Sequence, residues 1–138
     1  MRYLTLLTFL MACDPTGVGG GSDDEWEPVS FVDEGDACLA QQGTDVVVTV
    51  SVQECLSSSC DRDLGGECAA TVEGNTITLT SEIRWETAVT PEMCTDDCGL
   101  PSVTCTIPAL ADGTYTVVHG AQETTVVVPI ADACDPWM

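Results

Sequence analysis

An alternation of apolar and polar residues with period two constrains the fold most strongly. Val46, Val48, Val50 and Val52 occupy every second position of one segment, and Asp45, Val47, Thr49, Ser51 and Gln53 lie between them. Ile77, Leu79, Ile83 and Trp85 follow the same period in a second segment. Successive side chains of a strand point to opposite faces of its sheet, so this pattern predicts strands with one buried face. No segment shows a helical period, which favours an all-β fold.

Turn residues mark the boundaries between the remaining predicted strands. Gly74-Asn75 separates the strand after Asn75 from an earlier one that carries Cys68, Ala70 and Val72, which predicts a hairpin. Residues 114–119 and 123–128 predict a second hairpin around Gly120-Ala121, and residues 103–107 a further strand. Threonine-rich outer faces are typical of antiparallel sheets with one solvated side. The sequence therefore predicts an antiparallel β-sandwich of about seven strands.

The N-terminal residues predict export and a lipid anchor. Arg2 precedes about ten mostly apolar residues, which suit a secretory signal and are too few for the ~20 of a membrane-spanning helix. The leader ends in Leu10-Met11-Ala12-Cys13. These four residues resemble the lipobox of bacterial lipoproteins, which implies cleavage before Cys13 and a diacylglycerol on its thiol. The alternatives are an ordinary secretory signal that leaves Cys13 unmodified, and a cytosolic protein.

The leader defines the expected domain organisation. Residues 1–12 form the signal peptide, residues 13–36 the lipidated cysteine and an acidic, glycine-rich linker, and residues 37–138 the sandwich domain. Linker composition of this kind does not bury a core. Trp26 and Phe31 are unusual in such a linker, and we expect one or both to pack on the edge of the domain.

With Cys13 assigned to lipid, eight of the nine cysteines remain, and an even number in an exported chain predicts four disulfides. These are Cys38, Cys55, Cys60, Cys68, Cys94, Cys98, Cys105 and Cys134. They form two triplets, 55/60/68 and 94/98/105, between two single cysteines. We expect a Cys38–Cys134 bridge, one bridge inside each triplet and one between the triplets. Zinc is the alternative, because the spacings 94/98 and 55/60 also suit zinc ligands.

The charge excludes some partners. Three Lys+Arg stand against 23 Asp+Glu, a formal net charge of −20. Such a surface repels nucleic-acid phosphates and anionic lipid headgroups, so nucleic acid is excluded as a partner and membrane attachment has to go through Cys13. A large net charge also keeps a protein soluble and monomeric.

A short segment indicates which type of β-sandwich to expect. Residues 110–117, LADGTYTV, resemble the penultimate strand of immunoglobulin-like and fibronectin-type domains, with Tyr115 in the place of the corner tyrosine. The resemblance implies an immunoglobulin-like sandwich. The whole chain also resembles the small, acidic, cysteine-rich lipoproteins predicted in myxobacteria, most of which have no assigned activity.

Catalytic patterns are weak in this chain. His119, beside Gly120, is interpreted as a turn residue. The serines that could complete a hydrolase triad are candidates by residue type alone: Ser57, Ser58 and Ser59. The acidic clusters 33/34/36 and 96/97 lack calcium-loop spacing, and no motif calls for a cofactor.

The leading hypothesis is therefore a lipid-anchored cell-envelope protein with a non-catalytic binding or structural domain. It would recognise a protein or glycan through the cysteine-rich segments 54–67 and 87–101, because loops on a rigid sandwich commonly carry recognition. The alternatives are a calcium- or zinc-binding or hydrolytic envelope protein, and an inhibitor of a secreted hydrolase.

Overall fold

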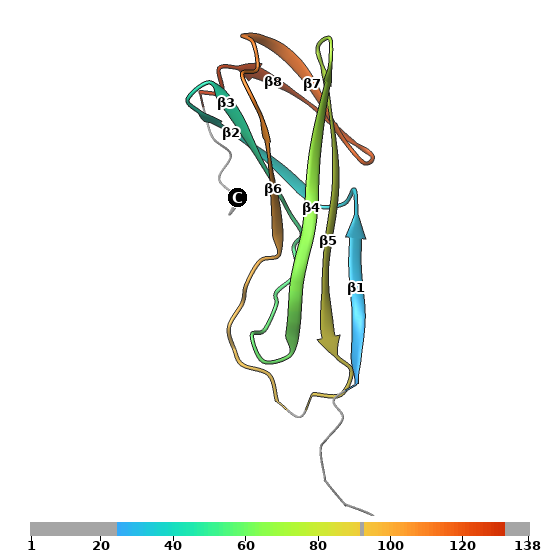
Figure 1. The fold of residues 1–138 in the computed structure, drawn as a ribbon. Helices are drawn as coiled ribbons and strands as arrows, with labels where there is room; N and C mark the ends of the chain where they lie inside the picture. Colours follow the sequence, from blue (N-terminus) through green and yellow to red (C-terminus); the bar gives the residue numbers. More distant parts are fainter. Residues whose placement is uncertain (1–24, 92, 132–138) are drawn as a thin grey trace, which may run out of the picture.

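The computed structural model describes residues 25–91 and 93–131, which form a two-sheet β-sandwich (Figure 1). This described part contains eight strands and no helix. The strands are β1 (Trp26–Val32), β2 (Asp36–Gln42), β3 (Asp45–Ser51), β4 (Asp61–Glu73), β5 (Thr76–Ala88), β6 (Ser102–Ile107), β7 (Gly113–His119) and β8 (Gln122–Val128). The predicted all-β sandwich with disulfides is confirmed.

Strand β5 is the centre of the larger, five-stranded sheet. Strand β4 pairs with β5 along its length, while β1 pairs with the C-terminal half of β5 and β7 with its first residues. Strand β8 extends the sheet beyond β7. The smaller sheet has the order β2-β3-β6.

The β5–β7 pair is parallel, whereas the other strand pairs are antiparallel. Local patterns predicted antiparallel sheets only. The parallel pair arises because the chain crosses to the smaller sheet through β6 before it returns as β7. This intervening strand reverses the chain direction, so β5 and β7 run the same way.

The core lies where the predicted apolar faces of the two sheets meet. Val46, Val48 and Val50 of β3 are fully buried, as are Ile77 and Ile83 of β5. These residues belong to one cluster that also includes Leu39, Val52, Leu79, Trp85, Ile107, Tyr115, Val117 and Val128. The alternation read from the sequence therefore identified the buried faces of β3 and β5.

Both predicted hairpin turns are present. Gly74 and Gly120 have φ of +59° and +53°, a left-handed backbone that glycine adopts without steric cost. At Gly120 a side chain would also overlap the backbone carbonyl of Asp33, so the β7–β8 turn packs against the β1–β2 connection. Glycine is required here for both reasons.

The linker prediction is wrong for its C-terminal part. Residues 26–32, assigned to the linker 13–36, form strand β1 and pair with β5 from Trp26↔Ala88 to Val32↔Glu82. The ring of Phe31 stacks on Trp85 with centroids 5.5 Å apart. The acidic composition of this segment suggested a linker. The segment forms a strand because one edge of β5 provides its backbone hydrogen-bond partners. The predicted leader and Cys13 lie outside the described residues.

The disulfide pairing also differs from the expectation. Cys55–Cys98, Cys60–Cys94 and Cys68–Cys105 all join one triplet to the other, so the expected bridges inside the triplets are wrong. For Cys55–Cys98 and Cys60–Cys94 the reason is topological, because the β4–β5 hairpin brings the segment before β4 next to the segment after β5. Cys68–Cys105 instead joins β4 of the larger sheet to β6 of the smaller one. Cys38 is also disulfide-bonded, and its expected partner Cys134 lies outside the described residues. Oxidised sulfurs lack the thiolates that zinc binds.

Tyr115 has the geometry expected of a corner tyrosine. Its hydroxyl donates to the carbonyl of Ala111 at 3.0 Å, while its ring is buried in the core cluster. The bond ties the connection before β7 to the strand itself, as in other sandwiches with this feature.

Candidate functional site

Two loops meet at one end of the sandwich, opposite the tip of the β4–β5 hairpin (Figure 1). We call them the loop end: residues 52–60, between β3 and β4, and residues 89–101, between β5 and β6. Cys55–Cys98 and Cys60–Cys94 join them with Cα separations of 4.9 and 5.5 Å. Leu56 and Gly99 add an isolated bridge with two backbone hydrogen bonds of 3.0 and 2.9 Å. Covalent bonds and backbone pairing therefore fix the loops to each other.

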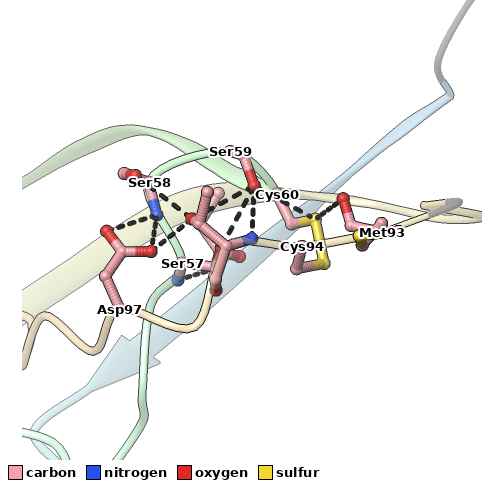
Figure 2. The surroundings of a disulfide bond; sticks show 9 residues. Ser57, Ser58, Ser59, Cys60, Met93, Cys94 and Asp97 are labelled. Carbon is pink, nitrogen blue, oxygen red and sulfur yellow. Dashed lines mark hydrogen bonds between the residues drawn. A yellow bond between two sulfur atoms is a disulfide. The ribbon is translucent and has the colours of Figure 1, made fainter.

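A network of hydroxyl groups reinforces this junction (Figure 2). The Thr95 N–H donates to Ser59 Oγ at 2.8 Å, and the Thr95 and Ser57 hydroxyls are 2.9 Å apart. Asp97 accepts hydrogen bonds from the Thr95 hydroxyl and, at 3.3 Å, from the Ser58 N–H. All three serines of the first loop thus contact the second loop.

Hydrogen bonding keeps Asp97 charged. The bond from the Thr95 side chain, followed by those from Ser58, lowers the pKa of this exposed carboxyl to about 2 from its ordinary 3.8. Hydrogen bonds to the ionised form favour it in this way.

A pocket of about 570 Å³ lies between the loop end and the sheet. Its apolar lining comes from Val29 and Phe31 of β1, Trp85 of β5 and Leu56. The remaining lining residues are Glu54, Cys55, Ser57, Cys60, Asp61, Thr87, Pro91, Cys94, Thr95, Asp96 and Asp97. The pocket therefore combines an aromatic and aliphatic wall with hydroxyl and carboxylate groups.

The lining carries four carboxylates and no basic side chain. Asp61 accepts from the Ser57 N–H at 2.7 Å, and Asp97 belongs to the hydroxyl network. Within the described residues, Glu54 and Asp96 have no hydrogen bond or ion pair. The arginines of the described chain are both engaged elsewhere: Arg62 Nη2 lies 2.6 Å from Glu86 Oε2, and Arg84 Nη1 lies 3.6 Å from Glu82 Oε2.

The structure brings together most of the predicted recognition segments. Residues 54–60 are joined to the described part of the second segment, residues 89–91 and 93–101, by Cys55–Cys98 and Cys60–Cys94. The outer parts of the predicted segments, 61–67 and 87–88, belong instead to strands β4 and β5. The expectation that Phe31 packs on the domain is confirmed by its contact with Trp85, but the sequence did not predict that Val29 and Phe31 line a pocket, because β1 was assigned to the linker.

The turn interpretation of His119 is wrong. His119 is the last residue of β7 and only 3% exposed, with its Nε2 2.9 Å from the Ser81 hydroxyl. Its Nδ1 is buried and has no hydrogen-bond partner among the described residues. The inward alternation Tyr115, Val117, His119 could have shown this, since it continues the buried face of the strand.

The described residues do not assemble a Ser-His-Asp triad. The hydroxyls of the first loop contact Thr95 at the loop end, whereas His119 pairs with Ser81 inside the sandwich. Asp33 accepts a hydrogen bond from the Ser81 N–H at 2.9 Å and forms none with the histidine. A triad needs the acid on the second ring nitrogen of the histidine.

Two residues of the first acidic cluster support the scaffold. Asp33 holds the backbone of β5 through Ser81, and Asp36 accepts from the Gln53 side chain at 3.0 Å. In the described ranges, no group of three or more His, Cys, Asp or Glu side chains is placed to hold a metal ion. Nor do these ranges contain a helix long and apolar enough to span a bilayer.

Compared with known proteins, the chain matches no family model, no curated protein and no solved structure. The fold and the site define a class in physical terms: a β-sandwich with a pocket under two disulfide-joined loops. Its function has to be argued from the chemistry of that pocket.

Proposed function

We propose that this protein is a non-catalytic binding module of the cell envelope, and that it holds its partner in the pocket beneath the disulfide-joined loops. The supporting observation is preorganisation. Two disulfides, one backbone bridge and the network around Thr95 and Asp97 hold the pocket-lining loops in place before any partner arrives. Loops that are already ordered lower the entropy cost of binding.

The cell-envelope part of the proposal rests on Cys13 and on the disulfides. Disulfides persist in oxidising compartments such as the periplasm and the cell surface. A diacylglycerol on Cys13 would hold the protein at a membrane, and a second acyl chain on the new N-terminus would make the attachment stable.

The fold suggests how an anchored domain would be oriented. Glu25, twelve positions after Cys13, lies at the loop end, where its carbonyl accepts a hydrogen bond from Val89 N–H at 2.8 Å. Twelve residues reach at most about 40 Å when fully extended. An anchor on Cys13 would therefore keep the pocket, rather than the opposite end of the sandwich, near the membrane.

Filling the pocket tests the binding role. Thr87 lines the pocket from β5, whereas Thr78 is exposed on the outer face of the same strand. We expect Thr87→Trp to reduce cross-linking to partners in intact cells at least about tenfold, since a central blocked contact costs more than about 1.4 kcal/mol. Thr78→Trp is the matched control and should leave the cross-links unchanged. Equal cross-linking by both variants would place binding elsewhere.

The anchor is tested separately by mass. The mature protein should begin at Cys13 with added acyl chains, and Cys13→Ser should move it from the membrane fraction to the soluble fraction. An unmodified Cys13 in the purified membrane protein would contradict the lipid anchor without affecting the pocket.

A further inference from the structure

We infer that the pocket receives a cationic side chain, an ammonium or guanidinium group on an aliphatic stem, presented by a lysine or arginine of a partner protein. This inference rests on the proposed binding function and specifies the chemistry of the partner.

The charge of the pocket points to a cation. Its four carboxylates face a lining without lysine, arginine or histidine. Two of them, Glu54 and Asp96, have no partner within the described residues and can accept new hydrogen bonds. Hydrogen bonds between ionised groups are about twice as strong as neutral ones. Both carboxylates are exposed to solvent. An anionic ligand would be repelled here, and a neutral one would gain no ion pair from them.

The apolar wall suits the stem and the cation of such a side chain. Phe31 and Trp85 stack on each other, and because Trp85 is only 6% exposed while Phe31 is partly exposed, Phe31 offers most of the accessible aromatic surface. Aromatic faces attract cations within about 6 Å, while the methylene groups of lysine and arginine pack on apolar surfaces. Val29 and Leu56 extend this surface.

The protein binds one of its own arginines in the same manner. The Arg62 guanidinium lies 4.0 Å from the ring centroid of Trp26 and is paired with the Glu86 carboxylate at 2.6 Å. Trp26 is the first residue of β1, and Arg62 is the second residue of β4, directly after the pocket residue Asp61. An aromatic ring next to a carboxylate is therefore already used to hold a guanidinium at this end of the fold.

The surroundings favour a protein as the source of the cation. Met93, next to the pocket residue Cys94, is 88% exposed, and an apolar side chain of this kind is suited to contact a protein surface. A free polyamine would gain little from it. The net charge of −20 also attracts a basic surface over longer distances.

A titration with small probes tests the inference on the full chain by NMR. The first probe is N-acetyl-lysine methylamide, and its control is the same compound with an acetylated, uncharged ε-amine. We expect the charged probe to shift the amide signals of Ser58 and Thr95 with a dissociation constant in the millimolar range, about that of a single weak contact. Raising the salt from low to high concentration should weaken binding about fivefold. The uncharged compound should cause no shift.

Paired substitutions locate the cation. Glu54→Gln together with Asp96→Asn should weaken binding about threefold to tenfold, as expected for two exposed ion pairs. Glu73→Gln with Asp112→Asn removes the same charge from exposed sites at the opposite end and should leave binding nearly unchanged. Phe31→Leu keeps an apolar side chain but loses the aromatic face, so a further loss of about twofold to fivefold is expected.

Three outcomes would overturn the inference. Binding of the uncharged compound as tightly as the charged one would exclude charge recognition. Equal weakening by the two charge-removing pairs would mean a general charge effect rather than a site. Spermidine, titrated in the same way, would replace the protein partner by a small amine if it shifted the Ser58 and Thr95 signals and N-acetyl-lysine methylamide did not. None of these three outcomes would by itself overturn the proposed binding function. That function fails on a different result, namely that Thr87→Trp leaves partner capture intact.

Discussion

The loop end and the body of the sandwich reach rigidity by different means. In the body, alternating apolar residues of β3 and β5 are buried between sheets whose backbones are paired along their length. At the loop end most side chains are exposed, and two disulfides with a hydroxyl network replace the core. The body can therefore be weakened through any large core side chain, whereas the loop end depends on a few cross-links. This contrast leaves the exposed loop residues available to contact a partner.

The largest effect is expected from the core. Leu79, in the N-terminal half of β5, is only 1% exposed, and Leu79→Ala should lower the free energy of unfolding by about 2–5 kcal/mol, measured by urea denaturation. Thr78→Ala, on the outer face of the same strand, should change it by no more than about 0.5 kcal/mol. Similar losses in both variants would contradict the two-faced description of β5.

The next effect separates the two regions. Cys60→Ala with Cys94→Ala should cost about 2–4 kcal/mol in the free energy of unfolding. Hydrogen exchange should become faster at Ser58 and Thr95, while the amides of β3 keep their protection, because the body has its own core. Cys68→Ala with Cys105→Ala, a bridge between β4 and β6, is the control and should leave the loop amides protected. Loss of protection throughout the chain would mean that the loop end and body unfold as one unit.

A polar pair inside the body should have a smaller effect. Ser81→Ala leaves His119 Nε2 without its partner at 2.9 Å, and the buried unsatisfied group should cost about 1–3 kcal/mol in unfolding free energy. Replacing both groups, Ser81→Ala with His119→Leu, should restore part of this loss, since no polar atom is left unpaired. A double variant as destabilised as the sum of the single ones would show that the hydrogen bond is not the source of the cost.

The smallest effect is local and depends on pH. The pKa of Asp97 is lowered to about 2, so its contribution to folding is fully present above the ordinary value of 3.8 and is lost as the pH falls towards 2. Acid titration should therefore shift the Ser58 and Thr95 amide signals between about pH 4 and 2 without unfolding β3. Asp97→Asn should remove this titration, and an unchanged titration in that variant would assign it to another carboxyl.

Local patterns were sufficient for much of the body. The alternation of apolar and polar residues identified the buried faces of β3 and β5. Glycine-containing turns identified the β4–β5 and β7–β8 hairpins. The same rule, continued from Tyr115 and Val117 to His119 along β7, would have placed His119 inside. For the site, the two cysteine-rich segments were predicted, but the aromatic wall was not, because Phe31 lies in a segment whose acidic composition suggested a linker.

Side-chain alternation and turn chemistry operate between neighbours along the chain, and the sequence by itself therefore determined the all-β class, the hairpins and the main core faces. The partners of each cysteine, the parallel β5–β7 pair and strand β1 as a wall of the pocket were decided only by the tertiary structure. These features depend on which distant segments meet in space. The β4–β5 hairpin aligns Cys55 and Cys60 with Cys98 and Cys94, and the passage through β6 returns the chain parallel to β5.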